Sequence, residues 1–246
     1  MRSAHLYFSL WIALLSLPAP AAVRYVNLNN PSPVAPYASW ATAATNIQDA
    51  IDTGAPGDQV LVTNGVYNVG ARVVFGALSN RVVVDKPMTV RSVNGPLVTA
   101  IQGWLTNNDS AVRCVYLTNG AALTGFTLAN GSTRSDGDWD REVSGGGVWC
   151  ESAQAFITNC IFYGNTAPNV GGGAYGGTLV DCLFTNNSAG YSGGAVYNST
   201  LIGCALTGNT GIWGGGACGS TLINCTLTGN STHDDSDHTS NGGGAS

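Results

Sequence analysis

A repeat of 21 to 22 residues limits the fold of this chain more than any other feature of its sequence. Four cysteines recur at this spacing, and an asparagine follows each of them five positions later. The repeated residues are Cys160, Cys182, Cys204 and Cys225, followed by Asn165, Asn187, Asn209 and Asn230. Glycine runs at 145–147, 171–173, 193–194, 214–216 and 242–244 separate the units. A fixed period of this length indicates a repeat architecture.

The pattern inside each unit is that of a β-strand. Apolar residues alternate, as in Cys160 and Phe162 or Cys204 and Leu206, which is the period of a strand. A helical repeat needs about 33 residues or more, and leucine-rich repeats need a leucine scaffold that is absent here. The sequence therefore predicts an all-β fold, a single-stranded right-handed parallel β-helix (solenoid), the hand following from the preference of parallel crossovers.

Stacked coils place equivalent residues of neighbouring units about 4.8 Å apart. We expect Asn165, Asn187, Asn209 and Asn230 to form a structural amide ladder, each side chain donating to a carbonyl of the next coil. The cysteine column should point inward, where a thiol packs as a small hydrophobe. Its Cβ spacing exceeds the mean of about 3.8 Å for a disulfide, whereas an oxidising compartment favours disulfides. Mostly free thiols are the favoured interpretation.

The rest of the mature chain fits the same plan. Residues 112–117 and 123–131 predict another coil, in which Phe126 and Leu128 take the positions held later by Cys and Phe. Residues 59–63 and 81–93 predict earlier strands. Residues 43–53 predict a short capping helix with Ile47, Ala50 and Ile51 on its apolar side, covering the open end of the first coil. The chain ends within a repeat unit, which suggests a longer protein unless a frayed last coil suffices.

The N-terminal segment has the features of a secretory signal peptide. Arg2 and His5 precede an apolar run at 6–17, and small residues at 19 and 21 mark a cleavage site. The alternative, an uncleaved anchor, is disfavoured because the run is shorter than the roughly 20 residues of a span. We therefore expect a signal peptide at 1–22, an N-terminal strand and capping helix at 23–58, and β-helix coils at 59–246. The predicted location is extracellular or on a bacterial outer membrane.

Charge is scarce, which narrows the possible partners. Only 9% of residues are charged and the net charge is −5, so a nucleic-acid partner is excluded by the absence of a basic stripe. Disorder is also excluded, because disordered chains are charged and poor in β-branched residues. The surface must instead consist of Asn, Thr, Ser and Gly.

Two stretches of the sequence resemble known families. Residues 40–67, with the segment 47–52, Gly57-Asp58 and the segment 64–67, resemble the N-terminal part of pectate-lyase-like β-helix proteins. The Gly-Gly-Ala units at 193–195 and 215–217, with Phe162-x-x-Asn165 and Phe184-x-x-Asn187, resemble the repeats of polymorphic outer-membrane proteins. Leu206 and Leu227 depart from that repeat, which has Phe there. The resemblance implies a right-handed β-helix displayed on, or secreted from, bacterial cells, and it specifies a fold better than a reaction.

Candidate site residues are few. Glu151 and Asp181 are the only charged residues between 145 and 230, they occupy different places in their units, and no Lys or Arg accompanies them to bind a uronate. Sugar hydrolysis needs two carboxyl groups roughly 5–9.5 Å apart, so these two are interpreted as scattered solubilising charges.

The remaining charge lies in two loops, at 135–144 and 233–238, which we expect at the same corner of the coil. Asp136, Asp138 and Asp140 alternate as calcium ligands do, but position twelve is Gly147 instead of the bidentate Glu of an EF-hand. Calcium is therefore the one candidate cofactor, and a solvated loop is the alternative. His233 and His238 flank three aspartates and form a candidate for weak divalent-metal binding.

These observations favour an exported, non-catalytic surface or secreted β-helix with an adhesive or envelope role. Its partner would be a polysaccharide or a surface receptor, and a region beyond residue 246 could associate with the outer membrane. The alternative function is a polysaccharide lyase or glycoside hydrolase of the pectate-lyase-like fold. No residue is predicted to be catalytic.

Overall fold

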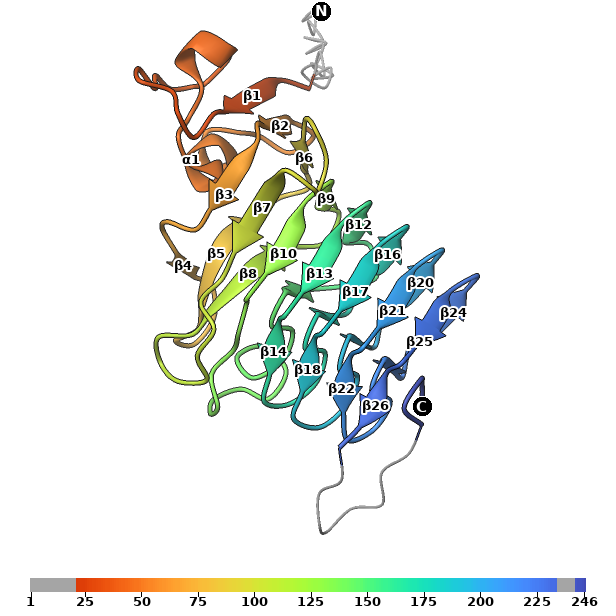
Figure 1. The fold of residues 1–246 in the computed structure, drawn as a ribbon. Coiled ribbons are helices and arrows are strands. Elements are labelled where there is room, and N and C mark those ends of the chain that lie inside the picture. Colours follow the sequence, from red (N-terminus) through yellow and green to blue (C-terminus); the bar gives the residue numbers. More distant parts are fainter. Residues whose placement is uncertain (1–20, 234–241) are drawn as a thin grey trace, which may run out of the picture.

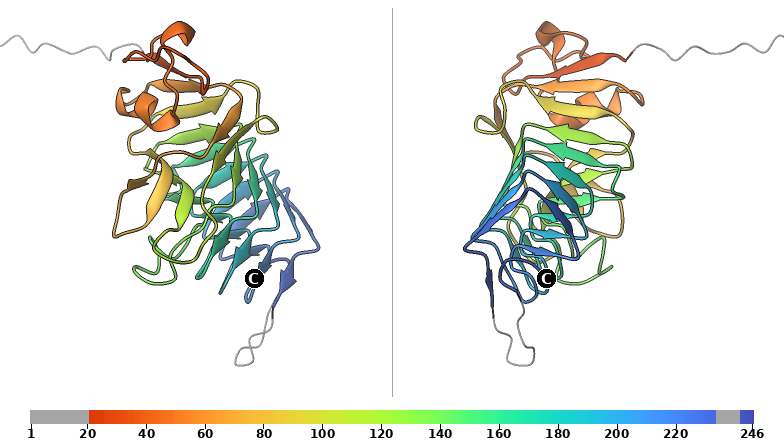
Figure 2. Two further views of the ribbon diagram at one scale, coloured as in Figure 1. Left: turned by 60° about the vertical axis from the view of Figure 1, so that its left-hand side comes forward. Right: turned by 90° about the vertical axis from the view of Figure 1, so that its right-hand side faces the viewer.

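The chain folds as a right-handed parallel β-helix whose coils stack along one axis, as the repeat predicts. The computed structural model describes residues 21–233 and 242–246. The N-terminal elements, red and orange in Figure 1, lie at one end of the stack, and the blue C-terminal coil lies at the other. Side views show the strands of successive coils in regular rows (Figure 2).

Within the described residues the strands form four sheets, which we call A to D. Sheet A contains β1 (Val23–Val26), β2 (Gln59–Val62), β6 (Thr89–Ser92), β9 (Ala122–Thr124), β12 (Phe156–Thr158), β16 (Thr178–Val180), β20 (Thr200–Ile202) and β24 (Thr221–Ile223). Sheet B contains β3 (Gly65–Tyr67), β7 (Thr99–Gln102), β10 (Thr127–Ala129), β13 (Ile161–Tyr163), β17 (Leu183–Thr185), β21 (Ala205–Thr207) and β25 (Thr226–Thr228). Sheet C contains β4 (Arg72–Val73), β5 (Ser79–Val84), β8 (Val112–Leu117), β11 (Val148–Cys150), β15 (Ala174–Tyr175), β19 (Val196–Tyr197) and β23 (Ala217–Cys218). Sheet D contains β14 (Thr166–Ala167), β18 (Ser188–Ala189), β22 (Thr210–Gly211) and β26 (Ser231–Thr232).

From β12 onward each coil passes through sheets A, B, D and C in that order. The strands of one sheet pair in parallel with those of the neighbouring coils, whereas β4 pairs antiparallel with β5. The sequence did not predict sheet D, whose strands are only two residues long. Sheet D separates sheets B and C, so that these two sheets face different sides of the solenoid.

The core is built from columns of apolar side chains that repeat once per coil. In sheet A, Leu179 pairs with Ile157 on one side and Leu201 on the other, and all three are buried. In sheet B the rings of Phe162 and Phe184 stack with centroids 4.3 Å apart. Burying each such side chain contributes about 1.5–3 kcal/mol. The predicted equivalence of Leu128 with the later Phe position is confirmed, because Leu128 pairs directly with Phe162.

The corner between sheets A and B is a tight turn made by one residue with positive φ. Asn159, Asp181 and Asn224 occupy it with φ of 49°, 52° and 52°. Asn and Asp tolerate this left-handed conformation better than other residues with a side chain. This requirement explains why the residue before each column cysteine is Asn, Asp or, at Gly203, glycine.

The glycine runs lie where neighbouring coils approach too closely for a side chain. A Cβ added to Gly146 would stand 2.1 Å from the carbonyl oxygen of Thr166, and one added to Gly172 would stand 2.2 Å from that of Ser188. Glycine is required wherever another backbone comes this near. The recurring Gly-Gly segments are therefore a packing requirement of the stack.

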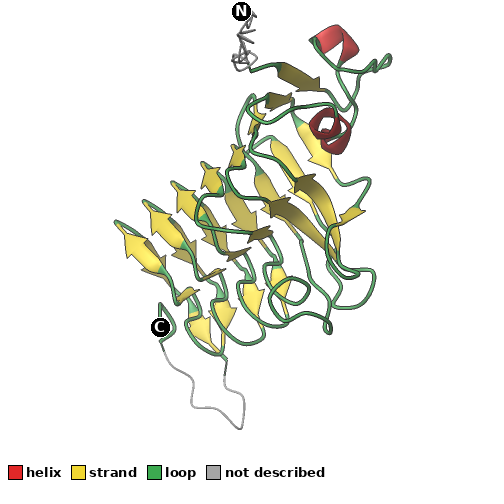
Figure 3. Cartoon of the chain, turned by 180° about the vertical axis from the view of Figure 1, so that it is seen from behind, coloured by secondary structure: helices red, strands yellow, loops and turns green. Residues whose placement is uncertain are grey.

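The capping helix is shorter than the sequence predicted. It runs from Ile47 to Asp52 as α1, and a separate 3₁₀ turn, η1, spans Trp40–Thr42. The difference arises at Asn46, which is extended and accepts a hydrogen bond from the backbone N–H of Asp49, so that the helix begins only after it. Ile47, Ala50 and Ile51 are buried as expected, at the N-terminal end of the stack where Figure 3 shows the helices. In the part of the chain that the structure describes, no helix is both long and apolar enough to span a bilayer.

A column of asparagines joins the coils at the corner between sheets B and D. The Nδ2 of Asn187 donates to the Oδ1 of Asn209 in the next coil at 2.9 Å and to the carbonyl of Phe162 in the preceding coil at 3.0 Å. The Oδ1 of Asn187 accepts from both the backbone N–H and the Nδ2 of Asn165. Asn209 and Asn230 repeat the arrangement. As predicted, each amide donates to the amide carbonyl of the next coil, and it also donates to a backbone carbonyl of the preceding coil.

The cysteines are free thiols, and most of them are buried. Cys160, Cys182 and Cys204 lie in the interior, and Cys225 is partly buried at the last described coil. Burial raises the pKa of Cys160 to about 12. The thiols of the column therefore pack in the interior without disulfides, as in the favoured interpretation.

We expect Asn187→Ala to lower the free energy of unfolding by roughly 3 kcal/mol or more, because each buried group left unpaired costs about 1–3 kcal/mol. Asn230→Ala should cost less, since Asn230 is only partly buried and ends the described column. Urea denaturation followed by circular dichroism measures both changes. Equal losses for the two variants would contradict a ladder whose contribution depends on burial.

We also expect the buried thiols to resist alkylation. At about pH 8 iodoacetamide should leave Cys114, Cys150 and Cys160 unmodified in the folded protein, because only the thiolate reacts and burial raises the pKa of each to about 12. Mass spectrometry after denaturation without reductant should then show adducts on all seven cysteines. Fewer adducts would indicate a disulfide.

Candidate functional site

The outer face of sheet C carries a column of aromatic side chains. Tyr116, Trp149, Tyr175 and Tyr197 follow one another in register on β8, β11, β15 and β19. Their ring centroids are 5.3, 5.8 and 5.8 Å apart, and the rings are nearly parallel. Since each ring covers its neighbour, the column presents ring edges and phenol hydroxyls outward. The indole N–H of Trp149 has no hydrogen-bond partner within the described part of the chain.

Two carboxylates border this column. Glu151 follows β11 and accepts hydrogen bonds from the Tyr116 hydroxyl, from the Thr118 hydroxyl at 2.6 Å and from the backbone N–H of Asn119 at 3.2 Å. Burial by itself would raise the pKa of Glu151, but the hydrogen bonds from Thr118 and Tyr116 outweigh it and leave that pKa below its usual value. Glu151 is therefore ionised at neutral pH.

Asp140 provides the second carboxylate, from the loop between β10 and β11. It hydrogen-bonds the hydroxyl of Tyr175. Burial, followed by the charge of Asp140, raises the pKa of Tyr175 to about 12, so that the phenol stays protonated and can donate. The aromatic column thus carries a tyrosine–carboxylate pair on each side of Trp149.

The loop at 133–144 is fixed over sheet C by a buried arginine. Arg113 on β8 is 2% exposed. Its guanidinium donates to the backbone carbonyls of Gly145 and Ser144, both at 2.8 Å, and of Arg141. A further bond joins it to the Asn80 side chain at 2.9 Å. Burial lowers the pKa of Arg113 to about 9, and its partners are neutral oxygens, so its role in this arrangement is to anchor the loop.

Glu142 attaches the same loop to the turn between β4 and β5. Its carboxylate accepts the backbone N–H groups of Ala77 at 2.7 Å and Asp138 at 3.1 Å, and it pairs with Arg134 at 2.9 Å. The hydrogen bond from Ala77 is the main cause of a lowered pKa for Glu142. Gly76 must lack a side chain here, because its Cβ would overlap the carboxylate.

These contacts leave two hollows on either side of Arg141. One, of about 430 Å³, lies between Phe75 and the Tyr116–Trp149 part of the column. The other, of about 380 Å³, lies between Asp140 and Tyr175. Arg141, Trp149 and Glu151 border both. We call the two hollows together the sheet C groove.

The guanidinium of Arg141 lies over the ring of Phe75, 4.6 Å from the ring centre. No ion pair of Arg141 occurs among the described residues. The groove therefore combines one cation, whose charge helps to lower the pKa of Glu151, with two carboxylates, phenol hydroxyls and an indole edge. Such a set can bind a hydroxyl-rich ligand and can also neutralise an anionic group.

The three aspartates predicted as calcium ligands have separate protein partners. Asp136 pairs with Arg134 at 3.1 Å, Asp138 accepts the backbone N–H groups of Asp140 and Arg141, and Asp140 contacts Tyr175. Nowhere in residues 21–233 and 242–246 do three or more His, Cys, Asp or Glu side chains form a group that could hold a metal. The structure therefore does not gather the three aspartates into one cluster of carboxylates. The predicted metal site at 233–238 lies mainly outside the described residues.

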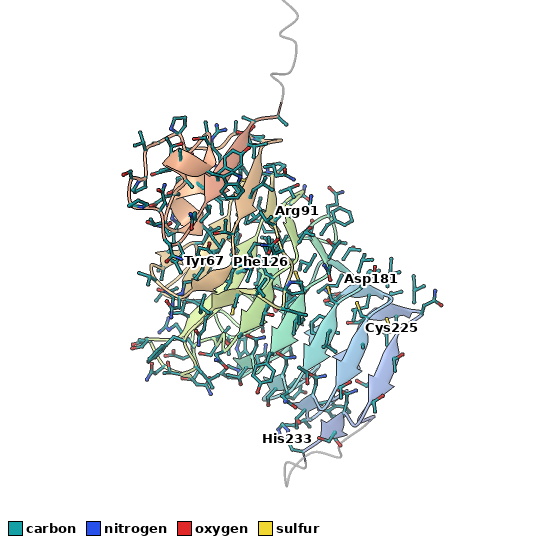
Figure 4. All side chains as sticks on the ribbon, turned by 45° about the horizontal axis from the view of Figure 1, so that its top comes forward. Tyr67, Arg91, Phe126, Asp181, Cys225 and His233 are labelled. Carbon is teal, nitrogen blue, oxygen red and sulfur yellow. The ribbon has the colours of Figure 1, made fainter. Side chains whose placement is uncertain are left out.

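Asp181 and Glu151, which the sequence suggested were scattered solubilising charges, lie in different parts of the solenoid. Asp181 lies at the corner between sheets A and B, near Cys225 and away from His233 (Figure 4). Glu151 belongs to the sheet C groove. The groove could not be predicted from the repeat, because Asp140 and Arg141 come from an insertion that the repeat does not contain. A usable signal was the aromatic residue two or three positions after successive glycine runs, at Trp149, Tyr175 and Tyr197.

Comparison with solved structures shows the fold. A rhamnogalacturonan lyase matches 83% of this chain and 56% of its own, at 14% identity and a TM-score of 0.51. The pectate lyase Pel9A matches 91% of this chain and 58% of its own, at 15% identity and a TM-score of 0.54. The chain thus spans a little over half the length of these two enzymes. No protein-family model and no curated protein sequence matches it.

We expect the loop clamp of Glu142 to weaken in acid. A carboxyl group whose folded pKa lies below its ordinary 4.5 stabilises the fold above that pH, and the contribution is lost as the pH falls through the folded value. Hydrogen-exchange protection of residues 134–144, corrected for the intrinsic rate, should therefore fall below about pH 4. In Glu142→Gln the loop should be less protected at neutral pH and its pH dependence flatter. Unchanged protection in this variant would contradict the clamp.

Proposed function

We propose that this chain is an exported polysaccharide-binding β-helix protein that holds a glycan chain in the sheet C groove. The observation that carries the proposal is the aromatic column bordered by Arg141 and Glu151 in two adjoining hollows. Ligand sites combine apolar and aromatic walls with a few placed polar groups, and this groove has that composition.

A linear polymer suits the geometry of the groove. The column advances by one aromatic side chain per coil, about 4.8 Å each time, so it offers equivalent contacts along the axis of the solenoid. Tyrosine and tryptophan edges present both C–H surface and a polar group. Sugar units carry both kinds of group, which makes a glycan a better match than a purely apolar ligand.

Export and display remain part of the proposal. They are supported by the predicted signal peptide at 1–22 and by a surface built from uncharged polar residues. A protein receptor on another cell is the alternative partner, and the binding experiment below separates it from a glycan. Both solved structures described above are named as lyases, of rhamnogalacturonan and of pectate, which agrees with a glycan ligand without assigning one.

Glycan cleavage is a second candidate function, and one observation favours it. Glu151 and Asp140 border the same hollow with Arg141 between the two halves of the groove. Hydrolysis requires one carboxyl group that stays protonated and one that is ionised. The lowered pKa of Glu151 suits a base and not an acid. Binding therefore has more support than hydrolysis, and a reaction that begins with proton abstraction remains the cleavage chemistry to test.

We expect Arg141→Ala and Glu151→Gln each to weaken glycan binding at the sheet C groove by about tenfold or more, because a hydrogen bond to a charged group contributes about 1.5–3 kcal/mol. Isothermal titration with a panel of neutral and uronic-acid polysaccharides, with and without calcium, measures this. Asp181→Asn, the other acidic position of the repeat region, is the matched control and should bind like the wild type. Equal binding of every glycan of the panel by the wild type and by both variants would place the ligand outside the sheet C groove.

The same panel distinguishes binding from cleavage. Release of reducing ends or of unsaturated products by the wild type, lost in Glu151→Gln, would show an enzyme. Binding without product formation would show a non-catalytic glycan-binding protein.

A further inference from the structure

A second groove lies at the corner between sheets B and D, away from the sheet C groove. It has a volume of about 490 Å³. Its walls include Leu105, Asn107, Asn130, Tyr163, Asn186 and Ser188. We call it the amide groove, because three of these six residues are asparagines. Among the described residues no Asp, Glu, Lys, Arg or His side chain lines it, in contrast to the sheet C groove.

The three asparagines have unused hydrogen-bonding capacity. The side chains of Asn107, Asn130 and Asn186 form no hydrogen bond with any described residue, whereas Asn165 and Asn187 beside them are committed to the buried ladder. An amide has two donors and one acceptor oxygen. The groove therefore offers donors and acceptors together, at positions open to solvent, without any charge.

The backbone fixes the positions of two of these amides. Asn130 and Asn186 end the sheet B strands of their coils with φ of 53° and 55°. The equivalent residues of the other coils are Gly164, Gly208 and Gly229, with φ of 62°, 66° and 60°. The missing side chain of Gly164 leaves room for the Asn130 amide, whose Oδ1 lies 3.2 Å from where a Cβ would stand. Asparagine thus occupies a turn at which glycine also fulfils the structural requirement.

Tyr163 adds an uncovered aromatic ring. Its neighbours in the same column of sheet B are Ala129 and Thr185, both small. The Tyr163 side chain is 48% exposed, and it stacks on no ring within the described residues. Unlike Trp149 and Tyr175, which have a ring on both sides, it can offer a face to a ligand. Leu105, 54% exposed, supplies apolar surface in the same hollow.

The loop that carries Leu105 and Asn107 is held in place by hydrogen bonds. The Ser132 hydroxyl donates to the carbonyl of Trp104 at 2.8 Å and accepts the backbone N–H of Thr106 at 3.0 Å. The Thr106 hydroxyl in turn contacts Asn108 at 3.0 Å. These bonds fix this wall of the groove before any ligand arrives.

We propose that the amide groove binds a neutral oligosaccharide, independently of the sheet C groove. Free amides match sugar hydroxyls, which need donors and acceptors at once, and the Tyr163 face with Leu105 matches the C–H face of a sugar ring. Charged ligands gain no ion pair here. Asn130, Tyr163 and Asn186 lie in three successive coils, so the contacts extend over about 10 Å along the axis, which is long enough for more than one sugar unit.

The test uses substitutions that the repeat itself supplies. Asn130→Gly with Asn186→Gly removes both amides while keeping a residue that other coils have at the same turn, and Tyr163→Thr introduces the residue found at 185, 207 and 228 of that column. Asn159→Gly with Asn224→Gly is the matched control. It makes the same change at the corner between sheets A and B, where Gly203 is the natural counterpart.

Titration calorimetry of the full chain with linear neutral oligosaccharides (cello-, xylo-, manno- and malto-oligosaccharides) and with oligogalacturonate measures binding. We expect at least one neutral series to bind the wild type, the control pair and Arg141→Ala equally. The double glycine variant and Tyr163→Thr should each bind it about tenfold more weakly or worse. Melting temperatures show whether each variant is folded, and Tyr163→Thr tests the proposal even if the double variant unfolds.

Three results would overturn the proposal. One is the absence of binding by every neutral series at millimolar concentration. Another is equal binding by the wild type and both groove variants. The third is loss of neutral-sugar binding in Arg141→Ala alone, which would move the ligand to the sheet C groove. Failure of oligogalacturonate binding in Arg141→Ala bears only on the function proposed for the sheet C groove, so the two proposals fail separately.

Discussion

Parallel, in-register pairing of each coil with the next is the constraint from which the rest of this structure follows. It places every residue directly above its counterpart one unit earlier, so a side chain that suits one coil must also suit its own copy about 4.8 Å away. Like charges stacked at this distance would repel. Amides do the opposite, since each has a donor for the neighbour's acceptor. The column through Asn165, Asn187 and Asn209 uses this complementarity in the interior, and the same constraint accounts for the scarcity of charge on the outside.

Side chains that point outward from successive coils are stacked in register in the same way as those in the core. A column of such side chains can form a binding surface. Tyr116, Trp149 and Tyr175 cover one another because the register leaves them no alternative. Their mutual stacking fixes the side chains but leaves only their edges free. Tyr163 differs because the coils on either side have small residues at its position. A single large residue in a column of small ones therefore keeps its ring face available, and a run of large residues gives a ridge of edges.

The repeat made the columns of the coils predictable from the sequence. Features that lie outside the repeat could not be predicted from it. Asn187 and Phe184 could be placed in columns because their spacing recurs, and the pairing of Leu128 with Phe162 followed from it. The start of α1 was predicted too early because residues 43–46 are compatible with a helix. In the structure the side chain of Asn46 instead accepts a hydrogen bond from the backbone N–H of Asp49 and caps the helix at that point. The sheet C groove was missed for a different reason. Arg141 and Asp140 lie in an insertion with no counterpart in other coils, and the carbonyl contacts of Arg113 that fold this insertion back involve no sequence pattern.

The position of the charged residues determines which ligands each of the two grooves favours. An insertion escapes the stacking constraint because it has no copy above or below it, so it can carry Arg141 and Asp140 without repulsion between equivalent residues. The loop at 133–144 thereby supplies two of the three charged groups that line the sheet C groove, while the described residues that line the groove at the corner between sheets B and D, which come mainly from the coils themselves, are all neutral. Two faces of one solenoid thus differ in the ligands they favour, and the difference arises from which of them an insertion reaches. A solenoid of this kind can acquire a charged site by lengthening one loop, without altering the columns that hold its coils together.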